Sequence, residues 1–110
     1  MVPLHVMRIS VTSTKTESEE SFLAKVQPCL SYLSWLKGSF DRNTDSIPFQ
    51  NSLVSIDGRD VWSLSAVVGI SVGRDRGIHL CRLYQAILRL IKLELTDCIV
   101  EGETETLKFT

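Results

Sequence analysis

The chain has 110 residues, 44% of them hydrophobic and 23% charged, and its formal net charge is −1 at pH 7. This length and apolar content suit a single domain over residues 1–110 with a hydrophobic core of its own. The near-zero net charge argues against a protein that coats nucleic acid by overall electrostatic attraction, although it allows a local basic surface.

No targeting signal or disulfide framework is evident. The N-terminal residues lack the basic and long apolar segments of a signal peptide, and no apolar run approaches the ~18 residues of a membrane span. Three cysteines, Cys29, Cys81 and Cys98, are an odd number and lie within apolar patterns, which favours reduced, buried thiols. We therefore expect an intracellular protein, in the cytoplasm or the nucleus.

The first quarter of the chain predicts a strand and then a helix. Residues His5–Thr12 alternate apolar and polar, as a half-buried strand does. The period then changes, and Thr16 and Glu19 have the spacing of a capping box. Pro28 is expected to kink or split the helix, and Gly38 to end it. The apolar stripe of this helix consists of Phe22, Val26, Cys29, Leu33, Leu36 and Phe40.

The middle of the chain predicts a long loop and a hairpin. Residues 37–51 read as one long irregular connection, of the kind that is usually functional or mobile. Ser52–Ile56 is a short strand, and Asp57-Gly58 is a strong hairpin signal. Val61–Val72 alternates cleanly, with large apolar side chains on one face. Its other face carries small side chains: Ser63, Ser65, Val67, Gly69 and Ser71.

The last third predicts a second helix and C-terminal strands. Ile78–Leu93 has helical periodicity, with a core stripe that includes Leu80, Tyr84, Ile87 and Ile91. Cys98–Glu101 and Thr104–Phe109 are expected as strands that are broken or bulged at Gly102. The pattern leaves open whether the acidic segment 94–110 is an ordered strand or a tail.

The element order β-α-β-β-α-β predicts an α+β fold. Each helix has one apolar stripe, which suits two helices packed on one face of a mainly antiparallel sheet. The ferredoxin-like arrangement, with a possible extra C-terminal strand, is the natural candidate. Because this fold carries many functions, it decides nothing about activity.

The segment Gly73–Gly77 has two interpretations. In the first, Gly73, Arg74, Arg76 and Gly77 form an anion site at a helix N-terminus, where free N–H groups and arginine donors would hold a phosphate or nucleotide. In the second, Asp75 is the N-cap of the helix and the arginines are solvated. The negative charge of Asp75 works against phosphate.

Charge is segregated along the sequence. Residues 59–92 hold six basic and two acidic residues, whereas residues 94–110 hold one basic and five acidic residues. This pattern allows a nucleic-acid-binding function, or complementary contact between subunits in which the basic helix and the acidic segment fix the orientation. It is also compatible with two solvated faces that neutralise one another. Aromatic side chains for base stacking are missing from the exposed face of Val61–Val72, so nucleic acid would use basic residues instead. These residues are Arg74, Arg76, Arg82, Arg89 and Lys92.

The leading hypothesis is a non-catalytic interaction or assembly module that self-associates, as a homo-oligomer, or docks on a protein partner. One candidate surface is the small-residue strand face defined above. The other is Pro28, Tyr32 and Trp35, an aromatic group off the core stripe. We expect no cofactor, metal or catalytic residue, because the sequence contains no standard motif and its two histidines are far apart. A nucleic-acid-binding protein and a phosphate or nucleotide binder are the alternatives.

Overall fold

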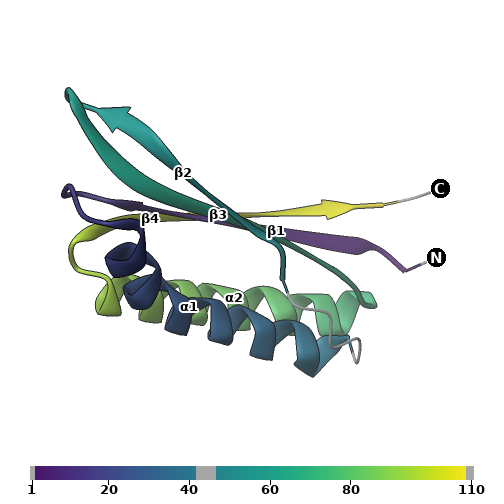
Figure 1. Cartoon of the computed structure of the whole chain (residues 1–110). Coiled ribbons are helices and arrows are strands. Elements are labelled where there is room, and N and C mark those ends of the chain that lie inside the picture. Colours follow the sequence, from purple (N-terminus) through teal and green to yellow (C-terminus); the bar gives the residue numbers. More distant parts are fainter. Residues whose placement is uncertain (1, 42–46, 109–110) are drawn as a thin grey trace.

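The computed structural model describes residues 2–41 and 47–108. They form a four-stranded antiparallel sheet with two helices packed on one face (Figure 1). The elements are β1 (Leu4–Ser13), α1 (Glu19–Phe40), β2 (Phe49–Ile56), β3 (Arg59–Ser71), α2 (Arg74–Glu94) and β4 (Cys98–Leu107). The strand order is β2-β3-β1-β4. The predicted ferredoxin-like arrangement is confirmed.

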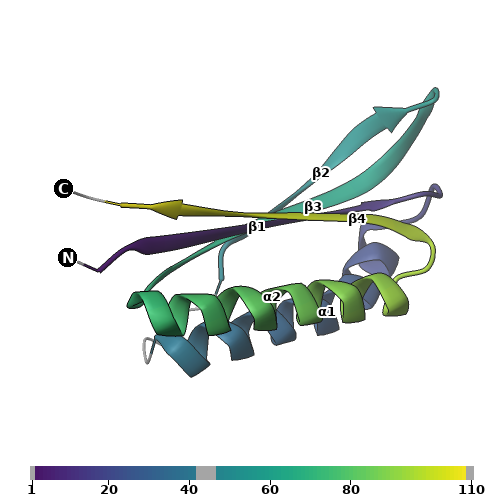
Figure 2. The same ribbon diagram turned by 180° about the vertical axis from the view of Figure 1, so that it is seen from behind.

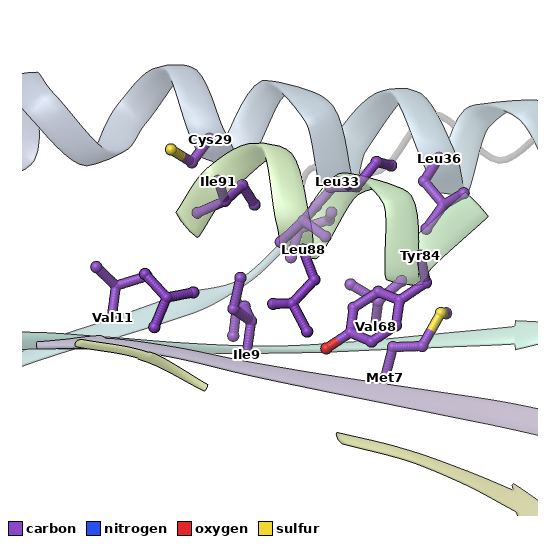
Figure 3. Packing of buried hydrophobic residues seen from close by; sticks show 14 of the residues in the cluster. Met7, Ile9, Val11, Cys29, Leu33, Leu36, Val68, Tyr84, Leu88 and Ile91 are labelled. Carbon is purple, nitrogen blue, oxygen red and sulfur yellow. The ribbon is translucent and has the colours of Figure 1, made fainter. Parts of the chain in front are cut away.

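The core lies between the helices and one face of the sheet. Alternation along β1 turns Met7, Ile9 and Val11 toward the helices, where all three are buried. The helical stripes face them, and Figure 3 shows side chains of both helices packed over those of β1 and β3. Most of the predicted stripe of α1 is buried, although Phe40 is only partly so.

Helix α1 differs from the prediction at both ends, and one of the two outcomes predicted for its proline is wrong. Its N-cap is Ser18, whose Oγ accepts a hydrogen bond of 3.1 Å from the Ser21 backbone N–H, so the predicted capping box at Thr16 is wrong. Pro28 lies inside one continuous helix and does not split it. Buried residues on both sides of this exposed proline hold the two halves against the same core.

The helix also continues past Gly38 to Phe40, so the predicted loop 37–51 is too long. Tertiary contacts explain the extra turn, because the Phe40 ring lies 5.8 Å from the His79 ring and beneath the Arg76 guanidinium. At the other end, Phe49–Asn51 belong to β2, where they pair with β3. Residues 42–46 of the predicted loop lie outside the described residues. The predicted hairpin turn is confirmed, with positive φ at Asp57 and Gly58.

Strand β4 is continuous through Gly102, so the predicted break and the extra C-terminal strand are both wrong. A Cβ at Gly102 would lie 2.9 Å from Leu88 Cδ2 and would overlap the Tyr84 hydroxyl. Because Gly102 has no side chain, α2 packs closely against the sheet at this position, and the glycine does not interrupt the strand. The acidic segment is ordered as far as Leu107, whereas Phe109 lies outside the described residues.

The Tyr84 hydroxyl bridges β1 and β4 from the helix side of the sheet. It donates a hydrogen bond to the backbone carbonyl of Arg8, and the Glu103 backbone also hydrogen-bonds to it. Burial raises the pKa of Tyr84 to about 12, although the bond from Glu103 acts in the opposite direction. The hydroxyl points toward the sheet in Figure 3.

A polar network ties the end of β1 and the start of α1 to the turn before β4. Glu17 accepts hydrogen bonds from Ser13 Oγ at 2.5 Å and Lys25 Nζ at 2.7 Å. Lys25 also donates to Asp97 Oδ2 at 2.9 Å, in the turn before β4. Burial raises the pKa of Glu17, but these hydrogen bonds outweigh it and the net pKa is lowered. The network ties α1 to the turn that starts β4.

Two further sequence-based expectations concern the cysteines and membrane-spanning helices. Cys29, Cys81 and Cys98 carry free thiols, but only Cys29 is buried; Cys81 and Cys98 are half-buried, so the prediction of buried thiols is wrong for these two. Burial raises the pKa of Cys29 to about 11, so this thiol is unreactive near neutral pH. In the described part of the chain, neither helix is long and apolar enough to cross a membrane.

Candidate functional site

The face of the sheet opposite the helices is the main candidate site. Figures 1 and 2 show both helices on one side of the sheet, and no described element covers the other side. The five small-residue positions predicted on β3 all belong to this open face. Ser65, Val67, Gly69 and Ser71 are exposed, and Ser63 is half-buried because it shares a hydrogen bond of 2.9 Å with Thr12.

Strands β1 and β4 complete the open face. Their register with β3 places Arg8 beside Val67 on one side and beside Glu103 on the other. Alternation along β4 adds Glu101 and Glu105 to the same face. Sequence analysis missed this contribution because it left the acidic segment open as a tail. The regular spacing of the glutamates was the signal that could have found it.

The middle of the open face is slightly concave and combines charged with apolar side chains. A hollow of about 320 Å³ is lined by residues of β3, β1 and β4, including Val67, Arg8 and Glu103. Arg8 pairs with Glu105 at 3.2 Å, and both side chains are exposed. Exposed apolar side chains also lie on this face: Val67, Ile99 and Leu107. A surface of this composition suits contact with another protein surface.

The predicted aromatic group lies in the helix layer, away from the open face. Pro28 and Trp35 are exposed on α1. Tyr32 is half-buried, and its hydroxyl donates a hydrogen bond of 2.8 Å to Glu94 at the end of α2. That hydrogen bond raises the pKa of Tyr32. The structure therefore keeps two members of the group accessible and uses the third to join the helices.

The structure separates the two arginines of the predicted anion site at Gly73–Gly77. Helix α2 already begins at Arg74, with Gly73 as its N-cap, so the prediction of Asp75 as the cap is wrong. Asp75 lies in the first turn, where its charge complements the helix dipole. Arg76 lies over the Phe40 ring at 5.2 Å, whereas Arg74 borders a groove beside β1 and β4. The two arginines do not converge on one ligand.

The basic residues of α2 form a stripe along one flank. At about 100° per residue, the stripe residues fall within about 80° of one another around the helix axis. They are Arg74, Arg82, Arg89 and Lys92, and all are exposed. Arg76 points toward α1 and is not part of this stripe. In the described residues, no three His, Cys, Asp or Glu side chains gather as a metal site requires.

No protein-family model matches the sequence, and no curated protein matches it. Among solved structures, a dimeric ferredoxin-like protein from an uncultured marine organism is similar at a TM-score of 0.54, with 10% identity over 98% of both chains. The de novo designed protein Foldit4 is similar at 0.49, with 18% identity over 96% of this chain and 99% of the designed one. A second design with a ferredoxin fold reaches 0.44, with 11% identity over 100% and 90%. The element order and strand order described above, together with the likeness to the marine protein, show that the chain has a ferredoxin-like fold; likeness at this identity establishes the fold alone.

Proposed function

We propose that this protein is a non-catalytic, intracellular assembly module that forms a homodimer by stacking the open faces of two sheets. The observation that carries this proposal is the uncovered face itself. Small side chains on β3 allow close approach of a second sheet, and exposed Val67, Ile99 and Leu107 supply apolar area.

The open face is large enough for a modest dimer. Four strands at ~4.8 Å spacing, each about ten residues long at ~3.3 Å per residue, project to roughly 600 Å². Two such faces bury about 1,200 Å², the lower end of the range for specific interfaces. The accessible area of a corrugated sheet exceeds its projection, so this value is a lower bound.

Charge selects the orientation of the two copies. A two-fold axis that runs across the strands would stack β4 on β4 and bring two rows of glutamates together: Glu101, Glu103 and Glu105 from each copy. An axis that runs along the strands stacks β4 on the open-face residues of β2, which are uncharged. Because like charges repel across a partly dry interface, the second arrangement is the one we propose.

The proposed arrangement changes one sequence-based hypothesis. Charge pairing between the basic helix and the acidic segment was expected to fix the orientation. The basic stripe of α2 lies on the helix side of the sheet, so it points away from a sheet-to-sheet interface. The similar marine protein is described as dimeric, which supports self-association as one use of this fold.

Mass in solution tests the dimer. We expect sedimentation equilibrium to show a mass of two chains. The dissociation constant of the dimer should lie between about 1 and 300 µM, as suits an interface of this area. Val67→Glu places a charge at the centre of the face, where Val67 is 50% exposed, and should give a folded monomer. Leu93→Glu is the matched control, because Leu93 is 75% exposed on α2, and this variant should remain dimeric.

Three results would overturn the proposal. The first is a wild-type protein that stays monomeric at the highest concentration measured. The second is a Val67→Glu variant that is folded by circular dichroism and still dimeric. The third is a Trp35→Ala variant that alone abolishes the dimer, because it would place the interface in the helix layer.

The basic stripe of α2 supports a second candidate function, nucleic-acid binding. It lies on the side of the molecule opposite the acidic face of β4, so nucleic acid could approach it without meeting the glutamates. Fluorescence anisotropy with a labelled oligonucleotide should then show binding that weakens steeply as salt is raised. If the anisotropy of the oligonucleotide does not change when the protein is added at low salt, this function is excluded.

A further inference from the structure

Strand β2 forms one edge of the sheet, and no described element pairs with its outer side. In the described part of the chain, its backbone hydrogen bonds go to β3. The two-residue turn makes Ile56 and Arg59 a hydrogen-bonded pair, so in an antiparallel ladder every second residue back from Ile56 bonds to β3. The residues between them point their N–H and C=O groups outward. They are Phe49, Asn51, Leu53 and Ser55.

The edge of β2 lacks the features that protect most edge strands. Natural edge strands are commonly shielded from other chains by charged side chains, proline or bulges. The opposite edge, β4, carries Glu101, Glu103 and Glu105, whereas the sequence of β2, Phe49–Ile56, contains neither a charge nor a proline. Strand β2 also pairs with β3 residue for residue, without a bulge. It is therefore the edge that can accept another strand.

Apolar side chains lie beside the outward backbone groups. Phe49 is opposite Ala66, which is buried in the core, so Phe49 and Leu53 lie on the helix side of the sheet. Phe49 is 39% exposed, and Leu53 is 54% exposed where the hairpin of β2 and β3 bends away from the helices in Figure 1. A strand added to β2 would direct the side chains of its hydrogen-bonded residues to this same side. The edge therefore combines unpaired backbone groups with apolar contacts for alternate residues of a new strand.

We propose that β2 binds an extended, uncharged segment of another protein as a fifth, antiparallel strand of the sheet. The backbone of that segment bonds to the outward groups of β2, and its alternate apolar side chains pack on Phe49 and Leu53. A second copy of β2 fits less well, because the two-fold register that pairs all of residues 49–55 places Asn51 opposite Leu53. The inference does not rest on dimer formation, since the outward backbone groups are not part of the open face.

A synthetic octapeptide in which valine alternates with threonine, with an ethylene glycol tail for solubility, tests the edge. Amide ¹H–¹⁵N spectra of the full chain give the dissociation constant, and amide hydrogen exchange locates the peptide. In the free protein, the amides of Asn51, Leu53 and Ser55 should exchange rapidly. Those of Ser52 and Val54 should exchange slowly, since they bond to β3. A saturating amount of peptide should slow exchange of the three outward amides by at least about tenfold.

Two pairs of matched changes separate edge pairing from other modes of binding. N-methylation of the valines removes the N–H donors that face β2 and should abolish binding, whereas N-methylation of the threonines alters the far edge of the peptide and should spare it. Leu53→Lys should weaken binding at least about tenfold, because it removes an apolar contact and places a charge at the edge. Leu93→Lys is the matched control, at a 75% exposed position of α2, and should bind the peptide as the wild type does.

The proposal fails if the peptide does not bind, if it protects amides of β4 in place of those of β2, or if both N-methylated peptides bind equally well. It also fails if Leu93→Lys weakens binding as much as Leu53→Lys. Peptide binding should persist in Val67→Glu, which keeps this test separate from that of the dimer. A Val67→Glu dimer that is lost on adding Leu53→Lys would assign the edge of β2 to a second copy of the chain, against the proposal.

Discussion

Lys25→Met is the substitution that most directly tests the polar network at the start of α1. The Glu17 side chain is only 6% exposed, and Lys25 is 21% exposed. Removing one partner of a buried ion pair costs about 3–5 kcal/mol, because the other charge is left buried. Glu17 keeps its hydrogen bonds from Ser13 and Ser21, so we expect a loss of about 3 kcal/mol in the free energy of unfolding at pH 7.

The pH dependence of that loss has a definite sign. Hydrogen bonds from Lys25 lower the pKa of Glu17 from 4.5 and that of Asp97 from 3.8. A lowered carboxyl pKa stabilises the fold above the ordinary value, and this stability is lost as pH falls through the folded-state value. The pKa of both carboxyls should rise in Lys25→Met, so the variant and the wild type should converge in stability at acidic pH.

The charge of Lys25 itself affects stability at alkaline pH. Although burial lowers its pKa, bonds to Glu17 and Asp97 raise the net pKa above 10.5. Its contribution is complete below 10.5 and is lost as pH rises through the folded-state value.

Urea unfolding followed by circular dichroism, at pH 7 and at a series of acidic pH values, measures both effects. Lys15→Met is the matched control, because Lys15 is 60% exposed at 3.3 Å from Asp97 and should cost no more than about 0.5 kcal/mol. Adding Glu17→Gln to Lys25→Met should recover part of the loss. A loss below about 1 kcal/mol at pH 7, or an equal loss at all pH values, would refute the reasoning.

Four further predictions concern single residues of the helices and the sheet. Gly102→Ala should destabilise the fold by about 1–3 kcal/mol in urea, because its Cβ would overlap the Tyr84 hydroxyl; a neutral result would mean that α2 can move away. Tyr84→Phe should cost about 1–3 kcal/mol, since the hydroxyl that bridges β1 and β4 is lost. Pro28→Ala should raise the melting temperature by restoring an N–H donor within α1, and a fall would reveal packing of the proline ring. Alkylation at pH 8 should leave Cys29 unmodified under native conditions, and rapid labelling would contradict its burial.

Periodicity predicted much of the fold and part of the candidate site. Alternation along β3 correctly grouped Ser65, Val67 and Gly69 on one face, because side chains of a strand alternate regardless of what packs on them. The ends of the helices were less predictable. Ser18 and not Thr16 caps α1, and the side chain of Glu17, next to the cap, is held by Lys25. A local capping signal does not include such contacts.

The same limit applies to the glycines and the arginines. Gly102 reads as a strand breaker in the sequence, yet it is required because α2 approaches β4 there. Arg74 and Arg76 are two residues apart in the sequence, but the helix turns Arg74 toward the groove beside β1 and β4 and Arg76 toward Phe40. Motif spacing does not reveal which side chains share a ligand once the segment becomes helical.

The sequence by itself determined the element order, the apolar stripe of each helix, the hairpin turn and the small-residue face of β3. These are local properties, set by the periods of helix and strand and by the positive φ that Asp57-Gly58 accepts. Tertiary structure alone decided that β4 lies beside β1, which pairs Arg8 with Glu105 across 97 positions of sequence and places His5 beside Thr106. Such contacts depend on how whole elements pack, and no local pattern encodes them.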